Sequence, residues 1–400
     1  MSASGLSAAR LDRMHDVMAG YVARGDVPGV VTLVSRRGET HVHAVGARAI
    51  GGAPMRRDTI FRIASMTKPV AAAAAMLLVE ECKLRLDEPV DRLLPELADR
   101  RVLTRLDGPL DDTVPARRPI SVRDLLTLRM GLGYVMGASG ASPIQQALRA
   151  QHLLQGPPRP QRLPAPDAWI RGVATLPLMS HPGERWMYDL GLDVLGVLIA
   201  RAAGRPLDAF LRDRIFDPLG MADTGFGVPA ERLDRFATSY AADPESGTLE
   251  RYDAAVGGEW SSPPAFPAAA SGLVSTVDDY LAFGAMLLHQ GTHGRERILS
   301  RASVEVMTAN HLTPDQQADG SIILGGNRSW GLGMAVTTRR DDLSAVPGRF
   351  GWDGGLGTSW ASDPREELVG ILMTQAAWSS PTPPPICRDF WTTAYQAIDD

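Results

Sequence analysis

A serine and a lysine three residues apart, Ser65 and Lys68, are the residues of this chain whose types and spacing point most directly to chemistry. Lysine occurs only at positions 68 and 83, so nearly all of the 41 basic residues are arginine. Arginine keeps its proton at physiological pH, whereas a partly buried lysine can release one. A lysine retained beside a serine therefore indicates an amine that takes the proton of the serine hydroxyl.

Ser65 is expected at the first turn of a buried helix. Ile60–Ile63 is typical of an extended approach, and Lys68–Cys82 is alanine-rich and apolar on nearly every side. At such a helix start, free N–H groups and the positive dipole end surround the serine. We expect this field to hold an oxyanion and to lower the pKa of Lys68. The structural alternative is a serine that only caps the helix beside a solvated lysine.

Bulk composition narrows the class of protein and its partners. The 400 residues are 44% hydrophobic and 22% charged, as in an ordinary globular protein, and the net charge of −5 favours neither nucleic acid nor a membrane as partner. With no apolar run of about 18 residues and no signal peptide, a cytoplasmic location is expected. Cys82 and Cys387 form no disulfide framework and no zinc motif, and both are expected to be buried free thiols.

Strand patterns lie near both ends of the chain, and helical patterns fill its middle. Amphipathic helices are predicted at both termini, and the first is followed by a hairpin, Val30–Ser35 and Thr40–Val45. Further strands are predicted at Leu332–Thr337, Gly357–Ala361 and Leu368–Thr374. The clearest other helices are Ser121–Leu128, Leu192–Ala203, Asp278–Gln290 and Ala302–Ala309.

This order predicts an α+β fold with one antiparallel sheet flanked by helices. Residues 1–83 and 267–400 would build the sheet domain, and residues 84–266 an inserted all-helical domain. The proline-rich stretches Gly156–Pro166 and Ser261–Pro267 are expected to lie over a surface as loops. A functional site is expected in a cleft between the two parts.

Several stretches of the chain resemble one known group of enzymes. They are FRIASMTKPV at Phe61–Val70, LRLDEPVDRLL at Leu84–Leu94, ISVRDLLTL at Ile120–Leu128, HPGERWMY at His181–Tyr188, FDPLGM at Phe216–Met221 and SGLVSTVDDY at Ser271–Tyr280. Together they resemble the serine β-lactamase/penicillin-binding-protein superfamily, from about residue 10 to 395. Within it, the chain is most similar to class C β-lactamases and family VIII carboxylesterases. The resemblance implies a β-lactamase/transpeptidase-like fold.

The second motif of that superfamily is a tyrosine followed two residues later by asparagine, and here it reads Tyr188-Asp189-Leu190. The resemblance implies that the Tyr188 phenol passes protons between Ser65, Lys68 and the leaving group. A phenol becomes a useful base only beside a cation. Leu190 replaces the asparagine that binds an amide side chain in β-lactamases, which disfavours amide-bearing substrates. The alternative for Tyr188 is a packed core tyrosine.

The third motif, Lys-Thr-Gly or His-x-Gly on a strand, is replaced by Trp352-Asp353-Gly354. A neutral indole cannot replace the cation that recognises the carboxylate of a β-lactam. Tryptophan here resembles the family VIII esterases, and a glycine-rich backbone at Gly354 permits close approach to substrate. The match implies that the N–H of Gly355 is the second oxyanion donor, beside that of Ser65. Ordinary core packing is the alternative for Trp352.

The combined prediction is a serine carboxylesterase that hydrolyses short-chain acyl esters through a covalent acyl-enzyme on Ser65. Lys68 and Tyr188 would move the proton, and Trp186 and Trp352 would supply part of the pocket wall. A small-molecule ester is the expected partner, with no metal and no organic cofactor. The alternatives are an acyltransferase that uses the same acyl-enzyme, a weak β-lactamase, and a catalytically silent binding protein on this scaffold.

Overall fold

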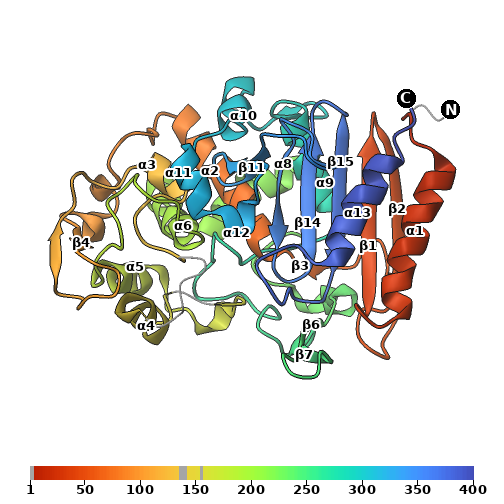
Figure 1. Ribbon diagram of the computed structural model, residues 1–400, viewed down its shortest axis with the longest axis horizontal. Coiled ribbons are helices and arrows are strands. Elements are labelled where there is room, and N and C mark those ends of the chain that lie inside the picture. Colours follow the sequence, from red (N-terminus) through yellow and green to blue (C-terminus); the bar gives the residue numbers. More distant parts are fainter. Residues whose placement is uncertain (1–3, 135–141, 154–155) are drawn as a thin grey trace.

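The computed structural model describes residues 4–134, 142–153 and 156–400. Its main feature is a seven-stranded antiparallel sheet in the order β11-β12-β13-β14-β15-β1-β2 (Figure 1). The strands are β1 Gly29–Arg36, β2 Glu39–Gly46, β11 Arg328–Trp330, β12 Ala335–Thr337, β13 Phe350–Gly354, β14 Thr358–Asp363 and β15 Leu368–Thr374. Both ends of the chain therefore contribute to one sheet, and β1 pairs directly with β15.

Helices cover both faces of this sheet. On one face lie α1 Ala8–Ala23 and α13 Pro385–Gln396, which run side by side (Figure 1). The other face is covered by α9 Val277–Leu288, and α2 Thr67–Glu80 belongs to the same hydrophobic core. Alternate residues of β1 belong to two hydrophobic cores: Val30 and Val34 to the core with α1 and α13, and Val31 and Leu33 to the main core, on the side of α9. This is the period of two expected of a strand that is buried on both faces.

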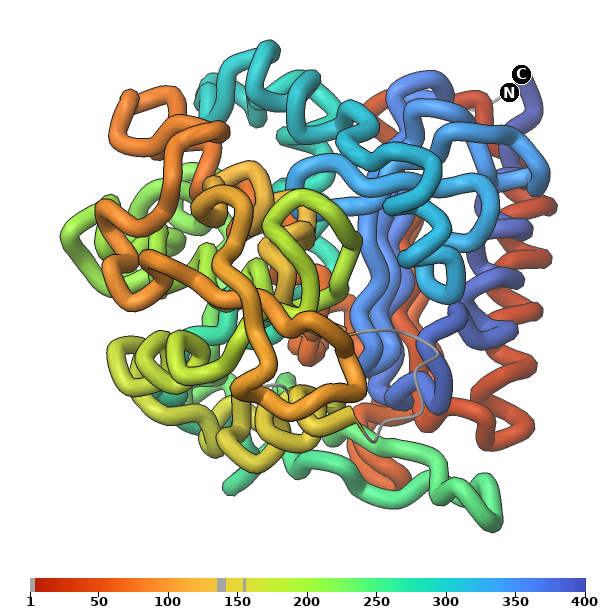
Figure 2. Tube along the Cα trace, turned by 60° about the vertical axis from the view of Figure 1, so that its left-hand side comes forward, coloured from red at the N-terminus to blue at the C-terminus, as the bar shows by residue number. Residues whose placement is uncertain are grey.

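The inserted region lies to one side of the sheet (Figure 2). Its longest helix, α6 Leu190–Ala203, packs on α2. Its shorter helices are α3 Val122–Leu126, α4 Pro143–Ala150, α5 Pro166–Ala174, α7 Leu207–Leu211 and α8 Asp217–Leu219. Two strand pairs also occur here, β4 Arg101–Leu103 with β5 Thr113–Pro115 and β6 Ser239–Ala242 with β7 Leu249–Asp253. The insertion is therefore mostly helical and not all-helical.

The remaining elements connect these two parts. Two short strands, β3 Phe61–Arg62 and β8 Val274–Ser275, pair just before α2 and α9. The others are the hairpin β9 Thr292–His293 and β10 Glu296–Arg297 and the helices α10 Arg301–Met307, α11 Pro314–Asp319 and α12 Ser321–Leu324. Tyr240 of β6 forms a bridge with Ala376, beyond the end of β15. The β6–β7 pair thus touches the sheet, and the boundaries at residues 83 and 267 stay a prediction.

The antiparallel sheet with an inserted helical region confirms the predicted fold class. None of the helices within the described ranges is long and apolar enough to cross a membrane. Both cysteines are free, but only Cys387 is buried; Cys82 is exposed, so the prediction of two buried thiols is wrong. Cys82 lies just beyond the end of α2 with a positive φ of 58°, where the chain turns away from the core.

Candidate active site

Ser65 lies in a tight strand-to-helix turn. It belongs to a single 3₁₀ turn, Ala64–Met66, between β3 and α2. Ala64 has a φ of 42°, in the left-handed region that residues other than glycine seldom adopt. Two contacts hold this backbone: the Thr67 hydroxyl donates to the Ala64 carbonyl at 2.7 Å and accepts from the Leu273 amide at 3.1 Å. Such strain persists only where the surroundings over-determine it.

Lys68 is fully buried one turn after Ser65. Its Nζ donates to Ser65 Oγ at 3.0 Å, to Asp189 Oδ1 at 2.7 Å and to the carbonyl of Ala270 at 2.8 Å. An ammonium group has three N–H donors, so every one of them has an acceptor. The predicted contact between serine and lysine is therefore present, and the alternative of a solvated lysine is wrong.

The charge state of Lys68 differs from the prediction. Burial lowers the pKa of the amine, but the negative charge of Asp189 and the neighbouring Tyr188 raise it, and the net pKa lies above its ordinary value. Burial is the largest single contribution, but the interactions with Asp189 and Tyr188 together outweigh it. The resting protein therefore holds Lys68 as an ammonium ion, and the predicted depression of its pKa is wrong.

Tyr188 completes the cluster from the opposite side of the cleft. The indole Nε1 of Trp352 donates to its phenol oxygen at 2.8 Å, and Lys68 Nζ lies 4.5 Å from its ring centroid. Burial and the charge of Asp189 raise the pKa of the phenol, while the charge of Lys68 and hydrogen bonds with Ser65 and Trp352 lower it. The net pKa of Tyr188 lies above its ordinary value. The structure thus brings Ser65, Lys68 and Tyr188 together, although the tyrosine is remote in sequence.

Asp189 is a charged member of the cluster that the sequence-based prediction gave no role. It precedes α6 with a φ of 86° and a ψ of −74°, a strained conformation for a residue with a side chain. One turn later, Asp193 is also buried and accepts from the Ala270 amide at 2.9 Å. Burial and the charge of Asp189 raise the pKa of Asp193 to about 7. The sequence feature that could have indicated a role for Asp189 is a pair of acids, four residues apart, at the start of an apolar helix.

The cluster opens into a cavity of about 500 Å³. The N–H groups of Ser65 and Gly355, the predicted oxyanion donors, are both in its wall, and neither has a hydrogen-bond acceptor among the described residues. Two free donors beside a nucleophile can hold an oxyanion. Other lining residues are Tyr134, Pro157, Pro158, Ile323, Arg328, Trp352, Asp353, Trp378 and Pro383.

Three predicted substrate-binding residues do not line this cavity, and for them the prediction is wrong. Leu190 is 1% exposed and belongs to the main core, because it is the first residue of an apolar helix. Trp186 is buried and packs behind Tyr188, with ring centroids 5.7 Å apart. Gly354 allows β13 to approach the turn before Ser65, since a Cβ there would collide with the Ile63 carbonyl. Gly354 therefore lies close to the backbone of Ile63 and not to the substrate cavity.

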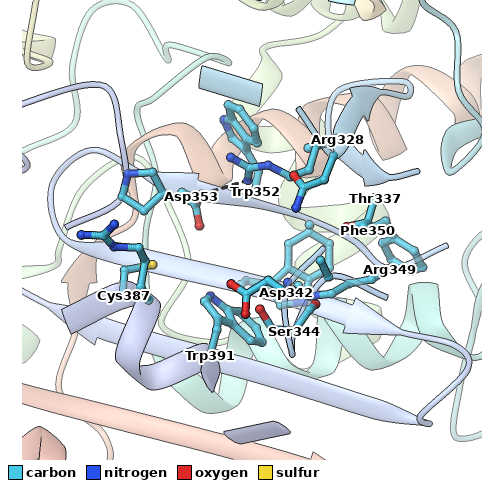
Figure 3. A pocket seen from close by; sticks show the side chains of 18 residues that line it. Arg328, Thr337, Asp342, Ser344, Arg349, Phe350, Trp352, Asp353, Cys387 and Trp391 are labelled. Atoms are coloured by element: carbon cyan, nitrogen blue, oxygen red, sulfur yellow. Dashed lines mark hydrogen bonds and ion pairs between the residues drawn. The ribbon is translucent and has the colours of Figure 1, made fainter. Parts of the chain in front are cut away.

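A second hollow, of about 280 Å³, lies beyond the wall formed by Arg328, Trp352 and Asp353 (Figure 3). Its far side includes Arg349 and Trp391, whose indole ring stacks under that guanidinium at 3.9 Å. None of Ser65, Lys68 and Tyr188 lines it. The catalytic candidate is therefore the larger cavity.

Comparison with known proteins identifies the family of this chain. A family model described as Beta-lactamase matches residues 14–383, so the chain belongs to that family. Protein Rv1367c of Mycobacterium tuberculosis is 42% identical over 364 residues, covering 88% of this chain and 86% of the relative. Esterase EstB of Burkholderia gladioli is 33% identical over 397 residues, covering 94% of this chain and 92% of that relative. The solved structure of EstCE1, described as a hydrolase with promiscuous acyltransferase activity, is 25% identical, with a TM-score of 0.77 over 98% of this chain and 99% of that one.

Proposed function

We propose that this protein is a serine carboxylesterase that hydrolyses short-chain acyl esters through a covalent acyl-enzyme on Ser65. The observation that carries the proposal is the contact of Ser65 Oγ with Lys68 Nζ at 3.0 Å, at the mouth of a cavity that Tyr188 also lines. Two N–H groups in the same wall, with no acceptor among the described residues, would supply the oxyanion site. The similarity to an esterase over most of the chain supports the same reaction class.

The reaction proceeds in two steps. The Lys68–Tyr188 pair first releases one proton to solvent. Ser65 Oγ then bonds to the ester carbonyl carbon while its proton passes to that pair, and the N–H groups of Ser65 and Gly355 hold the oxyanion. The carbon–oxygen bond to the alcohol breaks, and the departing alkoxide takes that proton. Water then gives a proton to the same pair and attacks the acyl carbon, and the proton returns to Ser65 as the acid leaves.

The cavity wall favours neutral esters over β-lactams. Trp352 stands where the superfamily carries a cation, and its N–H is already bonded to Tyr188. Arg328 also lines the cavity, but its guanidinium is engaged by Asp353 at 3.4 Å and by the carbonyls of Leu324 and Ile323. A substrate carboxylate would therefore have to displace an internal carboxylate. This makes a strong β-lactamase activity the weaker hypothesis.

Acyl transfer to an alcohol is the second candidate function. A cavity of about 500 Å³ has room for an alcohol much bulkier than a short acyl chain. Any acyl-enzyme can be intercepted by such a nucleophile in place of water. The printed description of EstCE1 combines both activities in one protein, which supports keeping transfer beside hydrolysis.

One assay tests these proposals. Purified protein and Ser65→Ala are incubated with p-nitrophenyl acetate, p-nitrophenyl butyrate and nitrocefin, with and without a simple alcohol as acceptor. We expect ester turnover by the native chain and loss of at least about 1000-fold in Ser65→Ala. Mass spectrometry should find the acyl group on Ser65 during turnover. Ester hydrolysis that survives the substitution would contradict the mechanism, and fast nitrocefin cleavage with feeble ester cleavage would move the function to β-lactamase.

A further inference from the structure

The second hollow, of about 280 Å³, has a floor of small residues. Ala335 of β12, Gly351 of β13 and Ala361 of β14 line it and are direct partners across three neighbouring strands. Residues paired in this way share one face of a sheet. Because none of the three has a side chain larger than a methyl group, the space above the strands can hold the apolar body of a small molecule.

The charged side chains that line the hollow leave an excess of positive charge. Two of them are already paired, because Asp353 accepts from Ser359 Oγ at 2.5 Å and from Arg328 Nη1 at 3.4 Å. The other described charged residues in the wall are Arg349, Arg388 and Asp342. Two cations against one acid favour a ligand with a single negative charge.

Arg349 and Arg388 carry N–H donors that none of the described residues accepts. Arg349 Nη1 donates to the Ser344 carbonyl at 2.8 Å, but its Nε is buried and has no acceptor. The guanidinium stacks on the ring of Trp391 at 3.9 Å, which fixes the plane in which its donors point. Arg388 is exposed, and its guanidinium has no acceptor within the described ranges. A buried charged donor without an acceptor is costly, so an acceptor from a ligand would stabilise it.

We propose that the second hollow binds a small organic carboxylate, which accepts hydrogen bonds from Arg349 and Arg388 and lays its apolar body on the floor of small residues. The Nε and Nη2 groups of Arg349 lie along one flat edge, and the two oxygens of a carboxylate match such an edge. The excess of one positive charge suits a monocarboxylate better than the dianion of phosphate. The site is separate from the proposed acylation site, since Ser65, Lys68 and Tyr188 do not line it.

The test is a binding titration with benzoate and its neutral analogue benzamide, followed by ligand-observed NMR. It uses the Ser65→Ala protein, so its outcome does not depend on the proposed esterase activity. We expect benzoate to bind with a dissociation constant in the millimolar range or tighter, as is usual for so small a ligand. Benzamide should bind at least about 10-fold more weakly, because it lacks the charge that the two arginines recognise. Equal binding of the two compounds, or no binding of benzoate, would overturn the proposal.

Substitutions in the wall should change the affinity for benzoate in opposite directions. We expect Arg349→Gln to weaken binding at least about 10-fold and Arg388→Gln, which is exposed, about 3-fold. Asp342→Asn should tighten binding about 2- to 5-fold, because it removes the acid that repels a carboxylate. The matched control is Arg340→Gln, which takes the same charge from the same loop outside the hollow and should leave the affinity unchanged.

The exposed positions keep the test decisive if Arg349→Gln fails to fold. Arg388 and Asp342 are both on the surface, so their substitution should leave the fold intact. Weaker binding in Arg388→Gln together with tighter binding in Asp342→Asn supports the site. The proposal is wrong if both variants bind benzoate like the parent protein, or if Arg340→Gln weakens binding as much as Arg388→Gln does.

Discussion

The hydrogen bond from Trp352 to Tyr188 provides the sharpest prediction, through the substitution Trp352→Phe. The indole nitrogen lies 2.8 Å from the phenol oxygen, while the ring packs on Trp330 at 4.7 Å. Phenylalanine keeps an aromatic ring but removes the donor. A hydrogen bond to a charged group contributes about 1.5 to 3 kcal/mol, so kcat/KM should fall about 10- to 150-fold. The bond lowers the pKa of Tyr188, so its loss raises that pKa and moves the rise of activity to higher pH.

The assay is the pH profile of kcat/KM for p-nitrophenyl acetate. The matched control is Trp186→Phe, because Trp186 packs on the same tyrosine at 5.7 Å and its indole N–H has no hydrogen-bond partner among the described residues. We expect Trp186→Phe to leave the pH profile in place. The reasoning is refuted if Trp352→Phe keeps wild-type kcat/KM and an unmoved profile, or if both substitutions shift it equally.

Two further predictions concern stability. Gly354→Ala should lower the free energy of unfolding by about 1 to 3 kcal/mol, because its Cβ would collide with the Ile63 carbonyl. Gly355→Ala should leave the free energy of unfolding nearly unchanged, because there is open space around that position. Urea unfolding of both variants checks this, and equal stabilities would contradict it. The pKa of Asp193 is about 7 in the folded chain against an ordinary value of 3.8, so the folded state keeps a proton that the unfolded chain has released, and the unfolding free energy falls as pH rises through this range. Asp193→Asn should therefore reduce the loss of stability between about pH 5 and pH 7 by up to about 2 kcal/mol, and a loss as large as that of the wild type would contradict this.

Much of the secondary structure could be predicted because its signals are local. The predicted hairpin Val30–Ser35 and Thr40–Val45 is observed as β1 and β2, and the apolar helix after Ser65 is observed as α2. The short strand β11 was not predicted, since its three residues carry no period long enough to detect. Edge elements of this kind are determined by the strand beside them more than by their own sequence.

The errors at the site share a different cause. Leu190, Trp186 and Gly354 were assigned from their positions in motifs, and the structure buries each of them against protein. The prediction for the pKa of Lys68 rests on the helix terminus alone, whereas Asp189, just before α6, contacts its Nζ and raises that pKa together with Tyr188. The spacing of a motif identifies which residues lie near a site, but it does not determine the direction in which each side chain points.

By itself, the sequence determined the proposed nucleophile and its neighbour, since three residues on a helix place Ser65 and Lys68 on one face wherever that helix lies. It also determined the fold class, through strand patterns at both ends of the chain and helical patterns between them. Only the tertiary structure decided which charges meet at Lys68, because Asp189 and Ala270 are 121 and 202 residues away along the chain. Electrostatic interactions depend on distance in space and on burial, and both are set by packing.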